Sequence, residues 1–404
     1  MSPVPPPIWP ILSRGVLKLL APFGGRVFRR WWLGLEPKRQ RHFYDRFLGS
    51  RGRIAASTAG IGAAVGVFYA AHLERTPVTG RWRVATVTRE QSEALADYEF
   101  QILADRYRNK LLSPDSREVQ RILAVAQRLI EANPDAPFLA NKNWRVFVVQ
   151  TDEKNAFVTP RGDIFVLSGL LEEFENDDQL AVILGHEMAH NILGHVTEQL
   201  SLVGFVDWLM IAGLAAIWTI VPAIHIAAIT TFFFNHCLQV MLTKPFSRMM
   251  EKEADEVGLQ LASKACYDSR EAFAYWLGAH RSLRSRGQAE VSSILSTHPS
   301  HCQRARRLQH LIPEALALRK EAGCPPLRWG YDPGLLAKAK LELAEAEEAA
   351  AQRATLIKRH SLNPFFWPTP GMEWSPGDTV RAGLAPWPPY IFQCAWDEKT
   401  LTPT

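Results

Sequence analysis

The chain has 404 residues, 47% of them hydrophobic, which is enough for one large domain with a sizeable core plus appendages. Its formal net charge is +5, but residues 1–53 hold about 11 Lys and Arg against 2 acids, so the remainder carries about −4. Because the basic charge is local, the sequence does not indicate a nucleic-acid-binding face on the main domain, and we expect no nucleic-acid partner.

The N-terminal segment, residues 1–53, is rich in arginine, poor in acids and interspersed with large apolar residues. This composition is typical of an organellar targeting segment on the matrix side, and a basic arm lying on anionic lipid is the alternative. Residues 54–71 follow, an uncharged stretch of about 18 residues, close to the shortest length that spans a bilayer. We predict one transmembrane helix there, with the basic N-terminus on its inner side; a buried soluble helix is the alternative.

Residues 72–143 are predicted to form a helical lead-in to the main domain, which we place at residues 144–325. Apolar side chains recur at helical spacing between Val119 and Ile130, so a helix packs on a sheet there. Residues 144–150 and 163–168 are predicted strands. For residues 326–404 we expect a helix and then a Pro- and Trp-rich tail.

The run His186-Glu187-Met188-Ala189-His190 is the strongest indication of chemistry in the chain. On a helix, residues four apart lie about 40° apart around the axis, so both imidazoles project from one face and can share a metal ion. Glu187 then lies beside them, placed to take a proton from a metal-bound water. The alternative is a helix that carries two histidines by chance.

A catalytic zinc site needs a third protein ligand, and the sequence offers two candidates. His195 follows His190 by five residues, which on one helix is about 140° round the axis, so we expect it to point away. Glu251 and Asp255 are four apart in a second expected helix and share a face, whereas Glu253 points about 160° away from that pair. One of the two carboxylates can bind metal while the other orients a ligand histidine. The alternative is a solvated acidic helix face.

The second apolar stretch, residues 209–234, has no acidic or basic charge apart from a histidine, and Pro222 lies near its middle. If His190 and Glu251 share one metal, a single membrane crossing between them is excluded, and two full crossings would need about 40 residues. We therefore predict an apolar hairpin, broken at Pro222, that re-enters or lies along the bilayer. Burial inside the protein is the alternative.

Three further motifs, together with H-E-x-x-H, point to a known family. They are the S-R-x-x-E-x-x-A-D run from Ser247 to Asp255, the strand, turn and strand of Asn155–Leu171, and His298-Pro299 followed by Arg304. The chain resembles the gluzincin-type membrane metalloendopeptidases related to HtpX and the CAAX prenyl proteases. Over roughly residues 54–345 it is most similar to the mitochondrial inner-membrane Oma-type peptidases, through residues 72–81, 186–195, 264–266 and 296–301.

The resemblance implies a fold and a set of site residues. The fold would be an α+β, zincin-like metalloprotease domain, mostly helical with a small sheet, with the transmembrane helix and apolar hairpin added. His186, His190 and Glu251 would hold one Zn²⁺ per chain, with Asp255 behind them and His298 or Arg304 stabilising the oxyanion. An edge strand would bind extended substrate by main-chain hydrogen bonds; its residues are Asp163, Ile164, Phe165, Val166 and Leu167. Cys266 and Cys324 stand where the resembling peptidases also carry cysteines, so they could pair.

The function that the resemblance implies is zinc-dependent endopeptidase activity anchored in the mitochondrial inner membrane, with the catalytic domain facing the intermembrane space. Its expected partners are inner-membrane lipid and membrane-tethered proteins cleaved under stress, including the dynamin-like inner-membrane fusion GTPase; a homo-oligomer is also compatible with the sequence. Two alternatives remain: an inactive scaffold or chaperone with the protease fold, and an HtpX-like or CAAX-type protease of another membrane. The intact Glu187 argues against the first.

Overall fold

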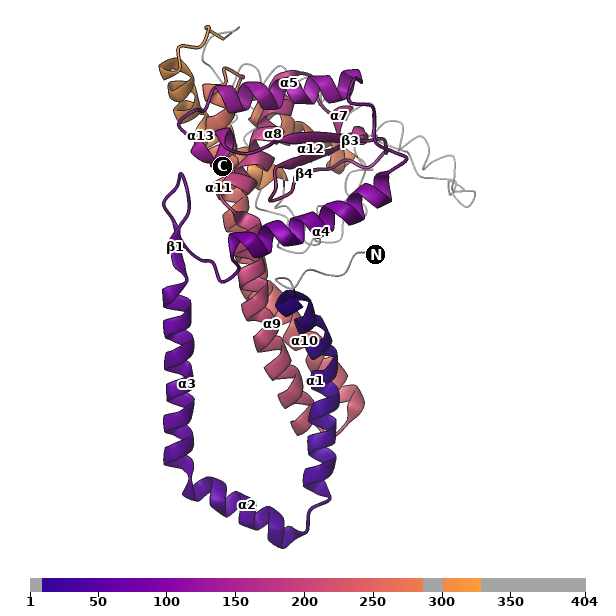
Figure 1. Ribbon diagram of the computed structural model, residues 1–404, viewed down its shortest axis with the longest axis vertical. Coiled ribbons are helices and arrows are strands. Elements are labelled where there is room, and N and C mark those ends of the chain that lie inside the picture. The colour runs from indigo at the N-terminus through magenta and orange to yellow at the C-terminus, as the bar shows by residue number, and fades with distance from the viewer. Residues whose placement is uncertain (1–8, 286–300, 328–404) are drawn as a thin grey trace, which may run out of the picture. The chain divides into compact units, whose positions relative to one another are not determined.

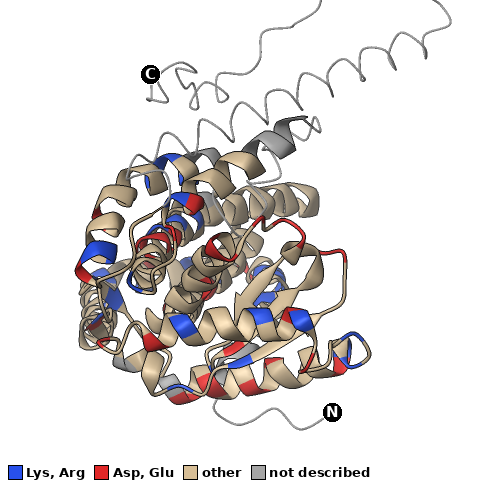
Figure 2. Cartoon of the chain, turned by 90° about the horizontal axis from the view of Figure 1, so that it is seen from above, with Lys and Arg blue, Asp and Glu red and all other residues tan. Residues whose placement is uncertain are grey.

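The computed structural model describes residues 9–285 and 301–327, and the chain divides into two compact units, residues 1–265 and 266–404. The described part is mostly helical with two small sheets, so the predicted α+β class is confirmed (Figure 1). Both acidic and basic positions occur along the helices in the view of Figure 2.

Three helices open the first unit: α1 (Trp9–Leu33), α2 (Pro37–Gly49) and α3 (Arg51–Ala71). Helix α3 contains the predicted span at residues 54–71 and begins three residues earlier. None of its residues is buried, and it is long and apolar enough to cross a membrane. An apolar helix whose residues are not buried against protein needs another apolar medium around it, which a lipid bilayer provides.

The predicted apolar hairpin is present, and its helices extend beyond residues 209–234. Helix α9 (His195–Ile220) and helix α10 (Ile224–Leu238) are separated by a short break that contains Pro222. A π-helical turn, η2 (Gln239–Thr243), then leads without interruption into α11 (Lys244–Lys264). By length and composition both apolar helical runs, 195–220 and 224–264, could cross a membrane. The hairpin is therefore continuous at both ends with the helices of the main domain.

Helix α1 packs along α9, an arrangement that the sequence did not predict. Lys18 Nζ lies 2.7 Å from Asp207 Oδ1. Near the other end of α1, Arg26 donates to the carbonyl oxygen of Val221 at 2.9 Å, and Arg29 donates to the last carbonyl groups of α9. Gly25 permits the close approach, because a Cβ there would lie 2.6 Å from a backbone oxygen of α9. Several of the basic residues at the N-terminus thus have protein partners.

The main sheet has three strands in the order β3-β5-β4: β3 (Arg145–Val149), β5 (Asp163–Leu167) and β4 (Ala156–Val158). Strand β5 pairs parallel with β3 and antiparallel with β4, and all five of its residues are buried. The prediction that Asp163–Leu167 forms an edge strand is therefore wrong. Among the described strands the open edge belongs to β4, because residues 110–112 hydrogen-bond to the outer side of β3.

The remaining elements of the first unit surround this sheet and the helix of the H-E-x-x-H run. They are β1 (Leu73–Arg75) and β2 (Trp82–Val84), which form a hairpin, α4 (Arg89–Tyr107), α5 (Arg117–Glu131), α6 (Pro137–Ala140), α7 (Ser168–Leu171) and α8 (Asp177–Ile192). The predicted amphipathic helix is α5, which buries Val119, Ile122, Val125, Ala126 and Leu129. Most of α8 is buried too, so the H-E-x-x-H helix is a central element of the core.

Two glycines bring α8 and α11 into backbone contact. A Cβ on Gly185 would lie 2.8 Å from the carbonyl oxygen of Gly258, and a Cβ on Gly258 would lie 2.6 Å from the backbone nitrogen of His186. Only residues without a side chain allow two helices to approach this closely. The contact sets His186 beside the acidic face of α11.

The second unit contains α12 (Arg270–Ser285) and α13 (His301–Glu321). Cys266 and Cys324 form a disulfide that closes a loop around these helices. Arg304 is buried, and its guanidinium carbon lies 4.1 Å from the centre of a ring of Trp276. His298 lies outside the described residues.

Candidate metal centre

Helix α8 has clear local reasons to form. Its N-cap, Asn176, accepts a hydrogen bond from the backbone N–H of Gln179 at 2.9 Å, and Asp177 and Asp178 occupy the first turn, where carboxylates favour the helix dipole. An apolar, buried middle section then leads to the H-E-x-x-H run in the last two turns. The helix therefore presents His186 and His190 on one face, as the spacing predicts.

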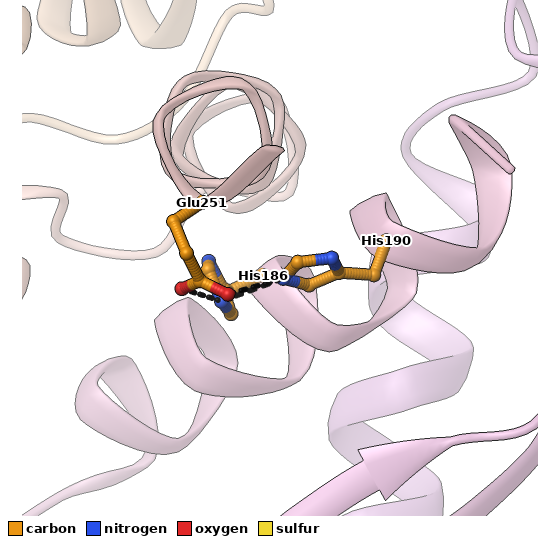
Figure 3. A group of neighbouring side chains, drawn as sticks. All are labelled: His186, His190 and Glu251. Carbon is orange, nitrogen blue, oxygen red and sulfur yellow. Dashed lines mark hydrogen bonds and ion pairs between the residues drawn. The ribbon is translucent and has the colours of Figure 1, made fainter. Parts of the chain in front are cut away.

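The three expected zinc ligands lie together in space (Figure 3). His186 Nε2 and His190 Nε2 are 3.1 Å apart, and the Glu251 carboxylate oxygens lie 3.5 Å and 3.4 Å from them. Donors about 2.0–2.1 Å from a tetrahedral zinc ion are roughly 3.4 Å from one another. Two imidazoles and a carboxylate with this spacing fit one zinc ion and leave its fourth position open, as a catalytic site requires.

Asp255 lies behind the site. Its Oδ1 atom is 3.1 Å from His186 Nδ1, and both side chains are almost fully buried. A carboxylate in this place accepts the Nδ1 proton, which directs the Nε2 lone pair of His186 toward the metal position. Glu251 and Asp255, four apart in α11, thus both face the two histidines of α8.

Glu187 follows His186 on α8 and is partly exposed, in contrast to its buried neighbours. Burial lowers the pKa of the nearby His190 to about 3, and this effect outweighs the hydrogen bond that the ring donates to Glu251, which favours the charged ring. A histidine that stays neutral keeps a lone pair for a metal ion. His190 therefore offers a lone pair at neutral pH.

Two residues that the sequence placed away from the site contact His190 directly or through one neighbour. His195 Nδ1 lies 2.8 Å from His190 Nδ1, and His195 Nε2 lies 3.2 Å from Glu253 Oε2. The expectation for His195 failed because α8 does not continue through it: Gly194 has φ +68° and starts α9 in a new direction. The signal was available, since a glycine after a helix commonly ends it in the left-handed conformation.

A cavity of about 490 Å³ opens beside His190. Asn191 and Lys142 line it, as does Pro160, which follows β4 by two residues. His190 and Pro160, which lies in the turn after β4, therefore line the same cavity.

The other predicted site residues are placed differently. Strand β5, with Asp163 to Leu167, lies inside the sheet. Arg304 belongs to the second unit, where it stacks on Trp276, and its role at the oxyanion stays a prediction, as does that of His298.

Residues 116–312 match the profile of Peptidase family M48. The chain is 36% identical over 345 residues to the mitochondrial metalloendopeptidase OMA1 of Bos taurus. This alignment covers 85% of this chain and 66% of the relative. It is 35% identical to OMA1 of Danio rerio, over 80% of this chain and 68% of the relative, and 30% identical to OMA1 of Schizosaccharomyces pombe, over 66% and 74%.

The alignment thus spans about two thirds of the vertebrate relatives. Metalloproteases of family M48 depend on zinc, and the donor set on α8 and α11 fits that metal. Residues 116–312 thus form a domain of Peptidase family M48, and the chain belongs to the mitochondrial OMA1 metalloendopeptidases.

Proposed function

We propose that this protein is a zinc endopeptidase that hydrolyses peptide bonds at the site formed by α8 and α11. The observation that supports this most directly is the spacing of His186 Nε2, His190 Nε2 and the Glu251 carboxylate, with Asp255 Oδ1 3.1 Å from His186 Nδ1 behind them. His186, His190 and Glu251 would hold the ion. When bound, zinc supplies Lewis acidity toward a water molecule and the substrate carbonyl group.

Glu187 would then act as general base and general acid. Its carboxylate accepts the proton of the attacking water and passes it to the amine that leaves when the peptide bond breaks. Because Glu187 is not a metal ligand, its role can be separated from zinc binding. The Glu187→Gln variant should keep its zinc and lose peptide hydrolysis by at least about 100-fold.

The comparison between this variant and the wild-type protein also tests the scaffold alternative. If both proteins show the same low turnover on a peptide substrate while both bind zinc, the protein is a scaffold with a protease fold and the proposal is wrong. Zinc content measured on the same samples separates loss of the metal from loss of the proton acceptor.

Strand β4 is the better candidate for binding the substrate main chain. The bonds Thr159 N–H to Asp163 O and Leu167 N–H to Asn155 O show that odd-numbered residues face β5. In an antiparallel pair the alternate residues point the other way, so Ala156 and Val158 present their backbone groups to the open edge. An extended peptide could add there as a further strand beside the cavity.

A proline at Val158 tests this assignment. It removes an outward N–H without breaking the ladder to β5, a position where edge strands tolerate proline. We expect Val158→Pro to raise KM for peptide hydrolysis while zinc affinity and thermal stability stay near wild type. Val158→Ala, which keeps the N–H, is the matched control, and equal KM values for both variants would contradict the assignment.

We further propose that α3 and the α9–α10 hairpin hold the enzyme in the mitochondrial inner membrane, with the site facing the intermembrane space. The mitochondrial relatives and the three apolar helical runs support a mitochondrial membrane. The substrates would be membrane-tethered proteins cleaved under stress, among them the dynamin-like inner-membrane fusion GTPase, and lipid would cover α3. Cysteines introduced on either side of the hairpin, near residues 199 and 244, should react with a labelling reagent from the same side in mitoplasts. Labelling from opposite sides would refute the proposed membrane arrangement of the hairpin.

A further inference from the structure

A continuous set of hydrogen bonds joins the β1–β2 hairpin, which follows α3, to the zinc-site residue His190. Arg81, directly before β2, binds two carboxylates at once. Its Nη1 and Nη2 atoms each lie 2.7 Å from a Glu198 oxygen, and its Nε and Nη2 atoms lie 2.9 and 2.7 Å from Glu253 Oε2. Thr79 and Thr76 donate to the other oxygen of Glu253.

The carboxylates and the histidine of this set are buried, so each of them needs a partner within the protein. Glu198, Glu253 and His195 are 2%, 7% and 3% exposed. Two buried carboxylates on neighbouring helices repel each other unless a cation lies between them, and removing that cation leaves an uncompensated buried charge. Arg81 is the cation that both carboxylates contact, and its planar guanidinium can bind both in a way that a lysine ammonium cannot.

The directions of the hydrogen bonds follow from the chemistry of each group. An ionised Glu253 only accepts, so His195 Nε2 must carry the proton and donate to it. A neutral His195 then has a lone pair on Nδ1, 2.8 Å from His190 Nδ1, so His190 donates from Nδ1. This leaves the lone pair of His190 on Nε2, the atom that lies 3.1 Å from His186 Nε2 in the metal centre.

We propose that Arg81, Glu253 and His195 form a positioning relay that holds His190 in the zinc-binding tautomer and orientation, and that ties the metal centre to the segment leaving α3. This inference rests on the proposed zinc site and names residues that do not touch the metal. Asp255 orients His186 in the same way, but by direct contact with its ring. His190 differs because its support comes through two intermediate side chains and starts at Arg81, in the hairpin that follows α3.

The test compares two substitutions at His195 in the full-length protein in detergent. His195→Leu removes the acceptor, whereas His195→Asn places a side-chain oxygen near the Nδ1 position. We expect the zinc dissociation constant, measured by competition with a chromogenic chelator, to rise on the order of 10–100-fold in His195→Leu and to stay within about threefold of wild type in His195→Asn. Arg81→Met should resemble His195→Leu.

Arg121→Met is the matched control, because Arg121 also pairs with a carboxylate of α8, at its first turn and far along the helix from His190. Co²⁺ replaces Zn²⁺ as a probe, and the visible absorption of the Co²⁺ protein should change in His195→Leu and not in Arg121→Met. Thermal unfolding of the metal-free proteins reports on the fold separately.

Wild-type zinc affinity in folded His195→Leu and Arg81→Met would overturn the relay. Equal weakening in His195→Leu and His195→Asn would also overturn it, because packing rather than the hydrogen bond would then matter. None of these measurements uses peptide hydrolysis. The Glu187→Gln experiment therefore tests the proposed protease function separately, and a negative result there is distinguishable from a negative result for the relay.

Discussion

The backbone contact between α8 and α11 makes Gly258 a sensitive point of the metal centre. In Gly258→Ala the new Cβ would lie 2.6 Å from His186 N and 2.7 Å from His186 Cα, against 3.4–4 Å for ordinary contacts. The neighbours are backbone atoms of a buried helix, which cannot turn aside. The helices must therefore separate by roughly 0.8 Å at this point.

The effect on the metal site follows from the position of Gly258 on α11. It lies two turns after Glu251 on the same face, so a displacement of α11 carries the Glu251 carboxylate away from His186 and His190. Zinc–ligand distances tolerate only about 0.2 Å. We expect zinc affinity to fall on the order of 10–100-fold, and stability to fall by about 1–3 kcal/mol, as for other overpacked cores.

Chelator competition and thermal unfolding measure these two effects on the same protein. Gly278→Ala on α12 is the control, because a Cβ there meets nothing within 4 Å and a helical alanine should leave stability unchanged or slightly higher. If Gly258→Ala binds zinc and unfolds like the wild-type protein, the helix contact does not set the ligand geometry and the reasoning is refuted.

Three further predictions concern single groups. Glu251→Ala should purify with little zinc by elemental analysis, and a full equivalent of metal would move the third ligand elsewhere. Because burial lowers the pKa of His190 to about 3, unfolded chains bind a proton below about 6.5 that the folded chain does not. The free energy of unfolding of the metal-free protein should therefore decrease as the pH falls from 6.5 toward 3. In His190→Gln this decrease should be smaller, as measured by urea titrations at several pH values. The same pH dependence in both proteins would contradict the prediction. Lys18→Met leaves Asp207 without its cation and should destabilise the protein in detergent by about 1–3 kcal/mol, an effect that adding Asp207→Leu should reverse in thermal unfolding.

Local periodicity carried much of the sequence-based prediction. His186, His190, Glu251 and Asp255 could be placed because each pair lies four residues apart on one helix, a relation that sequence spacing alone determines. The apolar stretch and its break at Pro222 were visible for the same kind of reason.

Other features of the fold and the site depend on contacts between segments distant in the sequence, and these contacts could not be predicted from residue spacing. The order of strands in a sheet is such a property, so β5 was taken for the edge although β4 has that place. The chain changes direction at Gly194, so the helical geometry that predicted His195 to point away from His190 does not apply. Arg81 is separated from Glu253 by most of the domain, and only the fold brings them together.

The packing of α1 on α9 gives the N-terminal basic residues a structural role in this fold. Arg26 and Arg29 act as a C-terminal cap supplied by another helix, because they satisfy carbonyl groups that α9 cannot pair internally. In a bilayer those carbonyls would otherwise need water or a defect in the lipid. A proteolytic cut after Arg30 would remove this cap and the cation of Asp207 together, so trimming of the N-terminus would leave the last carbonyl groups of α9 and the Asp207 carboxylate without these partners.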